Sequence, residues 1–558
     1  KGSLNTFLNA MTYPDKTVYP VASCNDKDFQ NLMDVYMDAV FHPNIYKEEK
    51  IFRQEGWHYE LESEESPLIY NGVVYNEMKG AYSSPESLLD SCTQKTLFPD
   101  NCYGKDSGGD PVYIPELSYE KFLNFHKTYY HPSNSYIYLY GDMDMAEKLE
   151  WLDREYLCHY EERPVDSSIP EQKAFAEPIE KEFHYSITEG EDDTNATYLS
   201  VNTVVGTDLD PVLYLAFQIL EYTLLDAPGA PIKQALIDAG IGKDVLGGYE
   251  SGILQPYFSV IAKDARRDQK GEFLSVVKGT LRKLADQGIN KKSLLAGLNY
   301  YEFKYREADY GNAPKGLMFG LQCLDSWLYD GDPMTHLCYQ ETFDFLKKEV
   351  ENGYFEQLIR DYLLDNPFEA VIVVAPEKNL TAKEDEKLAK KLADYKVSLS
   401  EEELEALVTA TRELKEYQEQ KAAFAKEQEQ LGEKISGAKR EERQAEENLK
   451  EIQTQIAELL VAVEEKKNDT MQLLENRAST KAKLQHYDTM MEQTKVQRAQ
   501  MNQRLIEMKS NSGEQEAQLK KYEEDFLAVQ AEIEKHQAES NRLEDEIEQL
   551  QKQLKDQN

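Results

Sequence analysis

The sequence lacks the features that mark membrane-spanning, disulfide-bonded and nucleic-acid-binding proteins. Its 558 residues contain no uninterrupted run of about 18 apolar residues, so no membrane span and no membrane partner is predicted. The six cysteines are scattered and form no C-x-x-C pair, which indicates reduced thiols and a cytoplasmic location. The net charge of -40 disfavours contact between the globular part and nucleic acid, because phosphate backbones repel acidic surfaces.

Proline and tryptophan are missing from the last part of the chain. The last proline is Pro376 and the last tryptophan is Trp327, whereas the earlier residues are rich in Tyr, Pro and Gly. Residues 419–558 contain 22 Lys and Arg against 30 Asp and Glu, so a net charge of -32 remains for residues 1–418. We therefore predict an acidic globular part of mixed helix and strand, followed by a different, helical part.

Two similar helix-to-strand endings occur in the globular part. In the first, Ser118 caps a helix that stops at His131, and the apolar segment Ser135–Asp142 follows as a strand. The second, Tyr362–Lys378, has the same order of aromatic helix, Asn-Pro turn and apolar strand. The repetition indicates two domains with a related plan.

The predicted fold class is α+β, with two related sheet-plus-helix domains and a long α-helical coiled coil. The domains cover residues 1–163, which are short of strands and incomplete, and residues 164–396. Residues 397–418 begin a helical hairpin, opened by a capping box at Ser400. Residues 419–558 form the coiled coil.

The coiled coil is predicted from a sustained 3.5-residue repeat. Steps of three and four residues from Leu449 define 31 seam positions, of which 21 are apolar, as two supercoiling helices require. Polar residues weaken this seam at Lys466, Thr470, Arg477, Arg498, Ser512, Gln515, His536 and Ser540. Ser510–Gly513 is the expected place for a bend or hairpin. The partner helix is left open: it belongs to a homo-oligomer, to another protein or to the same chain.

An acid lies among small apolar residues in the segment Tyr70–Tyr82. If this segment is helical, Glu77 shares its face with Val73, Val74, Gly80 and Ala81. A carboxylate buried there needs a cation, hydrogen-bond donors or a metal. The pattern alone is compatible with a structural ion pair, a partly exposed helix face or a functional acid.

Four segments, Lys1–Ser23, Gly72–Ser87, Tyr103–Asp142 and Leu224–Val245, together resemble the presequence-protease branch of the pitrilysin/insulinase-type zinc metallopeptidases. The resemblance spans residues 1 to about 418 and implies a zinc metalloendopeptidase that degrades short unstructured peptides. In that family an H-x-x-E-H helix supplies two histidines and a general-base glutamate. A distal glutamate, at the position that matches Glu77, completes the zinc site.

The sequence departs from this family because it contains no H-x-x-E-H. Among its nine histidines the nearest match is His159–Arg163 (HYEER), which lacks the second histidine. Glu77 is therefore the one expected zinc ligand, and no catalytic residue is predicted. Zinc, expected for a complete family member, is not expected to bind this chain stably. The chain starts at Lys1 without a signal peptide, so we expect the natural protein to begin upstream.

The residues Asn476–Ser510 resemble the coiled-coil arm of a structural-maintenance-of-chromosomes (SMC) ATPase, without its ATP-binding motifs. The peptidase-like pattern ends near Thr411–Glu419, and the family's second half is absent. The leading hypothesis is an inactive fragment of a zinc metalloendopeptidase, or one completed by a separate subunit that supplies the zinc helix. The alternatives are a non-catalytic coiled-coil scaffold with a peptide-binding module, or a chimeric artefact that joins unrelated sequences.

Three further signals are assigned to structure rather than chemistry. The segment Gly104–Pro111 lacks the spacing of a phosphate-binding loop and is predicted to be a turn-rich loop. His126 and His131 are five residues apart across a helix end, so they do not share a helical face, and packing roles are predicted. Cys92 and Cys102 have no activating base nearby in the sequence, so unreactive thiols are predicted.

Overall fold

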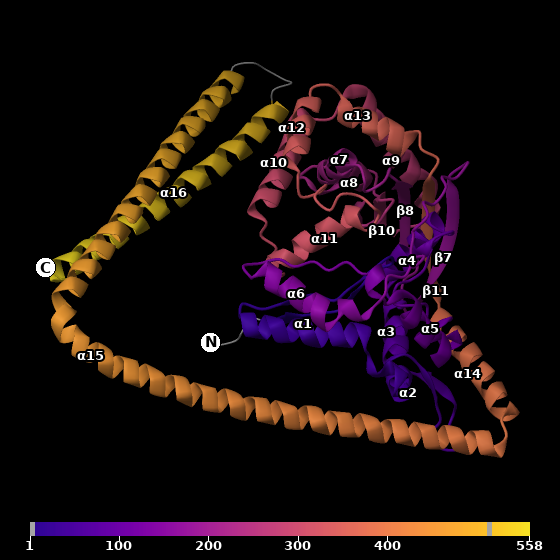
Figure 1. Ribbon diagram of the computed structural model, residues 1–558. Coiled ribbons are helices and arrows are strands. Elements are labelled where there is room, and N and C mark those ends of the chain that lie inside the picture. Colours follow the sequence, from indigo (N-terminus) through magenta and orange to yellow (C-terminus); the bar gives the residue numbers. More distant parts are fainter. Residues whose placement is uncertain (1–5, 510–515, 558) are drawn as a thin grey trace. The chain divides into compact units, whose positions relative to one another are not determined.

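The computed structural model describes residues 6–509 and 516–557. The chain divides into two compact units, Lys1–Glu419 and Gln420–Asn558, which are described separately (Figure 1). No helix in the described part of the chain is both long enough and apolar enough to cross a membrane.

A five-stranded sheet forms the centre of the first unit. Its strands are β7 (Ile179–Ile187), β8 (Thr197–Val204), β9 (Asp244–Glu250), β10 (Tyr257–Ala265) and β11 (Glu369–Lys378). The order is β7-β11-β8-β10-β9, and only the β7–β11 pair is parallel. Strand β11 follows the Asn-Pro turn of the second predicted helix-to-strand ending, so this strand is confirmed.

Helices cover both faces of this sheet. One face, built on residues such as Val201, Val260 and Val373, packs against the helices that follow β8 in the sequence (Figure 1). The opposite face, which includes Tyr198 and Ile372, packs against α4 (Pro85–Leu97). Successive strand residues alternate between these two faces. Because α4 comes from the N-terminal region, residues 1–163 and 164–396 share a hydrophobic core.

The remaining helices of the first unit surround this core. They are α1 (Asp26–Phe41), α2 (Glu49–Glu55), α3 (Val73–Ala81), α5 (Tyr119–Tyr129), α6 (Met145–Glu155), α7 (Pro211–Glu221), α8 (Pro231–Asp238), α9 (Lys270–Gln287), α10 (Lys291–Glu307), α11 (Lys315–Trp327), α12 (Gln340–Glu349), α13 (Tyr354–Leu358) and α14 (Leu380–Ser398). The predicted cap of α5 is confirmed, because Ser118 Oγ accepts a hydrogen bond from Lys121 N at 3.2 Å.

Only short strands are present in the described residues of the N-terminal region. They pair as β1 (Phe7–Leu8) with β4 (Val21–Ala22), β2 (Met11–Thr12) with β3 (Thr17–Val18), and β5 (His58–Glu60) with β6 (Ile69–Asn71). The segment Ser135–Asp142, predicted as a strand, belongs to none of the sheets in the described part of the chain. That prediction is wrong because its local pattern favours extended backbone, whereas a β-ladder also needs a partner strand, and no described strand pairs with it.

Two antiparallel helices make up the described part of the second unit. Helix α15 (Glu401–Lys509) begins in the first unit, and α16 (Glu516–Gln557) follows it. The rings of Tyr487 and His536 lie 6.1 Å apart, and the Arg498 guanidinium lies 5.4 Å from the centre of the Phe526 ring. Higher residue numbers in α15 therefore meet lower numbers in α16.

Among the described side chains of the second unit, each buried residue lies at a position of the predicted 3.5-residue repeat. These residues are Thr480, Met491, Thr494, His536, Ser540 and Leu543. The polar seam residue Ser540 has a partner on the other helix, because its Oγ donates a hydrogen bond to Asp488 Oδ1 at 3.1 Å. The bend expected at Ser510–Gly513 lies outside the described residues.

A buried polar network joins the N-terminal turn to residues that lie much later in the first unit. Asp15 Oδ2 accepts hydrogen bonds from Tyr103 OH at 2.8 Å and Tyr329 OH at 2.7 Å. Lys16 Nζ lies 3.0 Å from Asp15 Oδ1 and donates to Gly252 O, also at 3.0 Å. Both charged side chains are almost fully buried. A buried ion pair is tolerated when its remaining polar atoms find partners, as they do here.

Two acids lie beside this network, and burial raises the pKa of both. Asp208 Oδ2 accepts a hydrogen bond from Gly252 N at 2.8 Å, whereas its Oδ1 has no hydrogen-bond partner among the described residues. Burial raises the pKa of Asp208 well above its ordinary value. Burial also raises the pKa of Asp325 to about 6, although its carboxylate accepts a hydrogen bond from Tyr214 OH at 3.0 Å.

We predict that Asp325→Asn stabilises the first unit at high pH. Because folding raises the pKa of Asp325, the stability contributed by its protonated form is lost as the pH rises through about 6. The free-energy advantage of the variant should therefore grow by about 1–2 kcal/mol from pH 5 to pH 8. Urea unfolding followed by tryptophan fluorescence measures this, because all three tryptophans lie in the first unit.

The exposed Asp365 provides the control for this measurement. Asp365→Asn makes the same chemical change outside the core, so its effect on stability should be small. An equal pH dependence of the two variants would contradict the assignment of the effect to Asp325.

Candidate functional site

Helix α3, which carries Glu77, begins at a glycine that the surrounding backbone requires. Gly72 has a φ of +152°, and a Cβ atom there would overlap the carbonyl oxygen of Gly56. Asn71 Oδ1 accepts hydrogen bonds from Gly72 N and from Asn76 Nδ2, both at 2.8 Å. These contacts fix the first turn of α3.

The inner face of α3 packs against the rest of the first unit. Tyr75 is buried, and Met78 lies against Gly108 of the loop that follows α4. Lys79 Nζ forms an ion pair with Asp385 Oδ1 of α14 at 2.7 Å. These contacts determine which side of the helix faces outward.

The outer face of α3 is exposed and carries Glu77. Val73 is 40% exposed and Val74 37%, and Gly80 and Ala81 are exposed as well. The segment is helical, and Glu77 shares its face with the four small residues. Because this face is open, Glu77 needs no buried partner to compensate its charge.

The residues around Glu77 do not fit a zinc ion. Within residues 6–509 and 516–557, no group of three or more His, Cys, Asp or Glu side chains is arranged to hold a metal. A catalytic zinc site needs three protein ligands in a tetrahedral arrangement with one open position. A single exposed carboxylate provides neither the geometry nor the affinity, so no reaction step through zinc can be derived for this chain.

Both histidines near the helix end of α5 have structural partners. His126 Nδ1 lies 2.8 Å from Tyr46 OH, and its Nε2 lies 2.9 Å from Val40 O. His131 Nδ1 accepts a hydrogen bond from Ser133 N at 3.2 Å. The predicted packing roles are confirmed, and neither ring is directed at Glu77 by these contacts.

The loop Gly104–Pro111 is held by a lysine rather than built to bind phosphate. Lys95 Nζ lies 2.6 Å from Asp106 Oδ2 and 3.1 Å from Asp110 Oδ2. Ser91 Oγ also donates a hydrogen bond to Asp106, at 2.6 Å. Two carboxylates in the loop would repel a phosphate, which agrees with the prediction of a turn-rich structural loop.

The two cysteines of this region are not activated. Burial raises the pKa of the Cys92 thiol to about 12 and that of Cys102 to about 11. A reactive cysteine requires a lowered pKa, so the prediction of unreactive thiols agrees with their environment.

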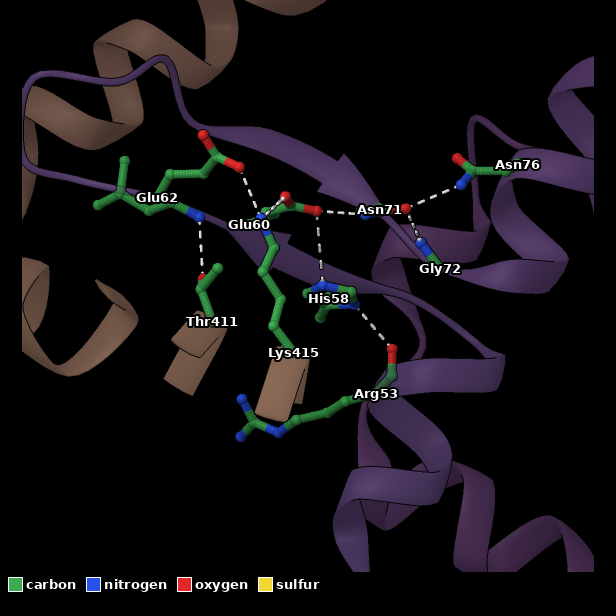
Figure 2. Close-up of polar contacts among 10 residues, drawn as sticks. Arg53, His58, Glu60, Glu62, Asn71, Gly72, Asn76, Thr411 and Lys415 are labelled. Atoms are coloured by element: carbon green, nitrogen blue, oxygen red, sulfur yellow. Dashed lines mark hydrogen bonds and ion pairs between the residues drawn. The ribbon is translucent and has the colours of Figure 1, made fainter. Parts of the chain in front are cut away.

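A polar network between the β5–β6 hairpin and α15, shown in Figure 2, was not predicted from the sequence. Lys415 Nζ on α15 lies 3.0 Å from Glu60 Oε1 and 2.6 Å from Glu62 Oε1. Glu60 also accepts a hydrogen bond from Asn71 Nδ2, and Asn71 Oδ1 accepts hydrogen bonds from Gly72 N and Asn76 Nδ2 at the start of α3. The network therefore connects α15 to the first turn of α3.

Glu60 is charged at neutral pH despite its burial. Burial raises its pKa, but the hydrogen bonds from Asn71 and Lys415 outweigh burial and leave the pKa below its ordinary value. His58 Nε2 lies 4.0 Å from Glu60 Oε2, and burial lowers the pKa of His58. No local pattern connects Glu60 with Lys415, because the two residues are far apart in the sequence.

Comparisons with known proteins relate the first unit to peptidases. Residues 116–300 match the family described as "Peptidase M16 inactive domain", and residues 374–426 match a family described as associated with subgroup C of the M16 peptidases. "Protein HypA" of Clostridium perfringens is 50% identical over 418 residues, which are 75% of this chain and 43% of that protein. "Presequence protease 1, chloroplastic/mitochondrial" of Arabidopsis thaliana is 40% identical over 427 residues, which are 75% of this chain and 39% of that protein.

The chain spans about two fifths of the length of these curated relatives. Among solved structures, a protease from Helicobacter pylori matches with a TM-score of 0.50 and 14% identity. That match covers 67% of this chain and 82% of the other, and it concerns the fold alone.

We predict that Lys415→Met increases the local opening of α3, because the substitution leaves the Glu60 carboxylate buried without its cation. Lys415 is 45% exposed, so the effect should be smaller than for a fully buried pair. The amides of α3 should exchange about three- to tenfold faster, which hydrogen exchange read by mass spectrometry measures. The control is Lys390→Met, which removes an exposed lysine of α14 and should leave this exchange unchanged. Equal exchange of α3 in both variants would contradict the connection.

Proposed function

The chain belongs to the peptidase M16 family, of the presequence-protease-like type, through the 75% of its length that aligns with those relatives, and we propose that these 558 residues hydrolyse no peptide bond by themselves. The single observation that carries this proposal is the outer face of α3, where Glu77 is exposed and lies in no metal-binding group of the described residues. Glu77 is the position that matches the distal zinc ligand of the family.

The missing groups account for the proposed inactivity. The sequence has no H-x-x-E-H, so two imidazole ligands and the general-base glutamate are absent. Without them, no group activates a water molecule and none transfers a proton to the leaving amine. The chain is thus proposed to be a non-catalytic portion of a zinc metalloendopeptidase for short unstructured peptides. The exposed face of α3 is where a zinc helix supplied by a separate subunit would lie.

We predict that the purified chain shows no zinc-dependent cleavage of an unstructured fluorogenic peptide. Zinc retained after dialysis should be well below one ion per chain, and Glu77→Gln should change neither zinc content nor background hydrolysis. Fluorescence assays with and without a chelator, together with metal analysis, measure both quantities. Chelator-sensitive cleavage that Glu77→Gln abolishes would contradict the proposal.

A second proposed function, peptide binding without hydrolysis, is favoured by the open edge of the sheet. The edge strand β7 carries two ion pairs. Glu180 pairs with Lys270 at 2.6 Å, and Glu182 pairs with Arg267 at 2.7 Å. The other edge strand, β9, has the uncharged residues 246–248 at its centre, although the carboxylate of Glu221 accepts a hydrogen bond from the backbone of Tyr249 in the same strand. An extended peptide can add a strand to such an edge by main-chain hydrogen bonds, whereas charged side chains discourage this.

We predict that Leu246→Lys weakens binding of an unstructured peptide by about tenfold or more, because it places a charge on the open edge. Fluorescence anisotropy of a labelled peptide measures this affinity. Leu295→Lys is the matched control, since Leu246 is 37% exposed and Leu295 on α10 is 39% exposed. Equal binding by the two variants, or no binding by the unmodified chain, would rule out β9 as the peptide site.

We also propose that residues 419–558 form a coiled coil that folds back on itself. The 3.5-residue repeat and the contacts of Tyr487 with His536 and of Asp488 with Ser540 support this proposal. The relation to an SMC-type arm rests on Asn476–Ser510 and is proposed from the sequence alone. A cytoplasmic location is proposed because all six cysteines are free.

A further inference from the structure

The backbone of β10 bonds alternately to β8 and to β9. Val205 N, just beyond the end of β8, donates a hydrogen bond to Pro256 O at 2.7 Å. Hydrogen-bonding groups alternate in direction along an antiparallel strand, so Phe258 also directs its backbone to β8. The residue between successive β8 contacts, Ser259, therefore directs its backbone to β9.

Three residues of β9 consequently turn their backbone groups outward. Ser259 lies opposite Gly248 in the register, so the backbone of Gly248 faces β10. The residues that alternate with Gly248 along the strand face away from the sheet. They are Val245, Gly247 and Tyr249.

Carboxylates occupy two of these three outward positions. Val245 N donates a hydrogen bond to Asp244 Oδ1 at 2.8 Å. The carboxylate of Glu221, the last residue of α7, accepts a hydrogen bond from the backbone N–H of Tyr249. Its Oε1 lies 3.3 Å from the place that a Cβ atom of residue 248 would take, so glycine there gives the carboxylate room. A peptide strand that adds to β9 must therefore compete with Glu221 for the amide of Tyr249.

The surroundings of Glu221 oppose its negative charge. Its pKa is raised to about 7, chiefly by burial and then by the neighbouring acids Asp226 and Glu250. The amide hydrogen bond and Lys304 of α10 act in the opposite direction, and Tyr301 of α10 is a further titratable group beside it. Near neutral pH the carboxyl group is therefore partly protonated, and a protonated carboxyl accepts a weaker hydrogen bond than a carboxylate.

We propose that Glu221 limits how far a peptide strand can pair along β9. While the carboxylate holds the Tyr249 amide, the peptide pairs as far as Gly247, and it extends to Tyr249 only when the carboxylate is released. This inference rests on the proposed function of β9 as a peptide-binding edge, and it makes Glu221 the residue that sets the length of the ladder. The carboxylates, the strand and the neighbouring charges all lie between residues 221 and 304.

The direct test is fluorescence anisotropy of a labelled unstructured peptide that contains no Asp, Glu or His. Glu221→Ala frees the Tyr249 amide, so the peptide should bind this variant about three- to tenfold more tightly than the unmodified chain at pH 8. The affinity of the unmodified chain should rise by a similar factor from pH 8 to pH 6, because protonation weakens the same contact. The affinity of Glu221→Ala should lack this rise.

Glu307→Ala is the matched control, because it removes an exposed glutamate from the last residue of another helix, α10. It should bind the peptide like the unmodified chain at both pH values. Equal affinities of Glu221→Ala and the unmodified chain at pH 8 would overturn this inference and leave peptide binding at β9 standing. If neither of them binds the peptide, the proposed function of β9 fails, and this inference fails with it.

Hydrogen exchange without peptide tests the contact itself. The amide of Tyr249 should exchange about three- to tenfold faster in Glu221→Ala than in the unmodified chain or in Glu307→Ala. Unchanged exchange of this amide would contradict the role of Glu221. Because the pH dependence of binding is measured on the unmodified chain, a poorly folded variant does not prevent the test.

Discussion

The packing of α4 against one face of the five-stranded sheet holds the first unit together. Strands β8, β10 and β11 direct alternate residues to opposite faces, and α4 covers the face that the later helices leave open. The N-terminal region has strands of only two or three described residues each, so it has no extensive sheet of its own to support a core. Its helix α4 shares a hydrophobic cluster with the sheet, to which the Asp15–Lys16 network adds polar contacts.

Some N-terminal surfaces are ordered and yet exposed. Helix α3 is fixed at its first turn by Asn71 and Gly72 and on its inner face by Tyr75, whereas its outer face, which carries Glu77, is exposed. The segment Ser135–Asp142 is similarly supported by α11 on one side while its backbone remains unpaired. Among the described residues, one of these surfaces presents a carboxylate, and the other presents extended backbone that makes no backbone hydrogen bond from residue 136 to residue 141.

Local signals predicted much of the fold, whereas contacts between distant residues were not predictable. The cap at Ser118 and the strand of Tyr362–Lys378 depend on neighbouring residues, and both occur in the structure. The pairing of Glu60 with Lys415 joins residues far apart in the chain, and no spacing rule connects them. At the candidate site, helical periodicity predicted that Glu77 shares a face with Val73 and Val74. It did not predict that this face is exposed.

The sequence by itself determined the family relationship, the absence of H-x-x-E-H and the 3.5-residue repeat of the C-terminal part, because each of these is a property of residue order. Tertiary structure alone decided that Ser135–Asp142 pairs with no strand of residues 6–509 and 516–557, since an extended segment becomes a strand only when another strand completes its hydrogen bonds. It also decided that seam residues of α15 such as Tyr487 meet α16 of the same chain. A heptad pattern specifies which face of a helix is buried, but the same pattern can be satisfied by any compatible partner, so the choice of partner depends on how the chain folds in three dimensions.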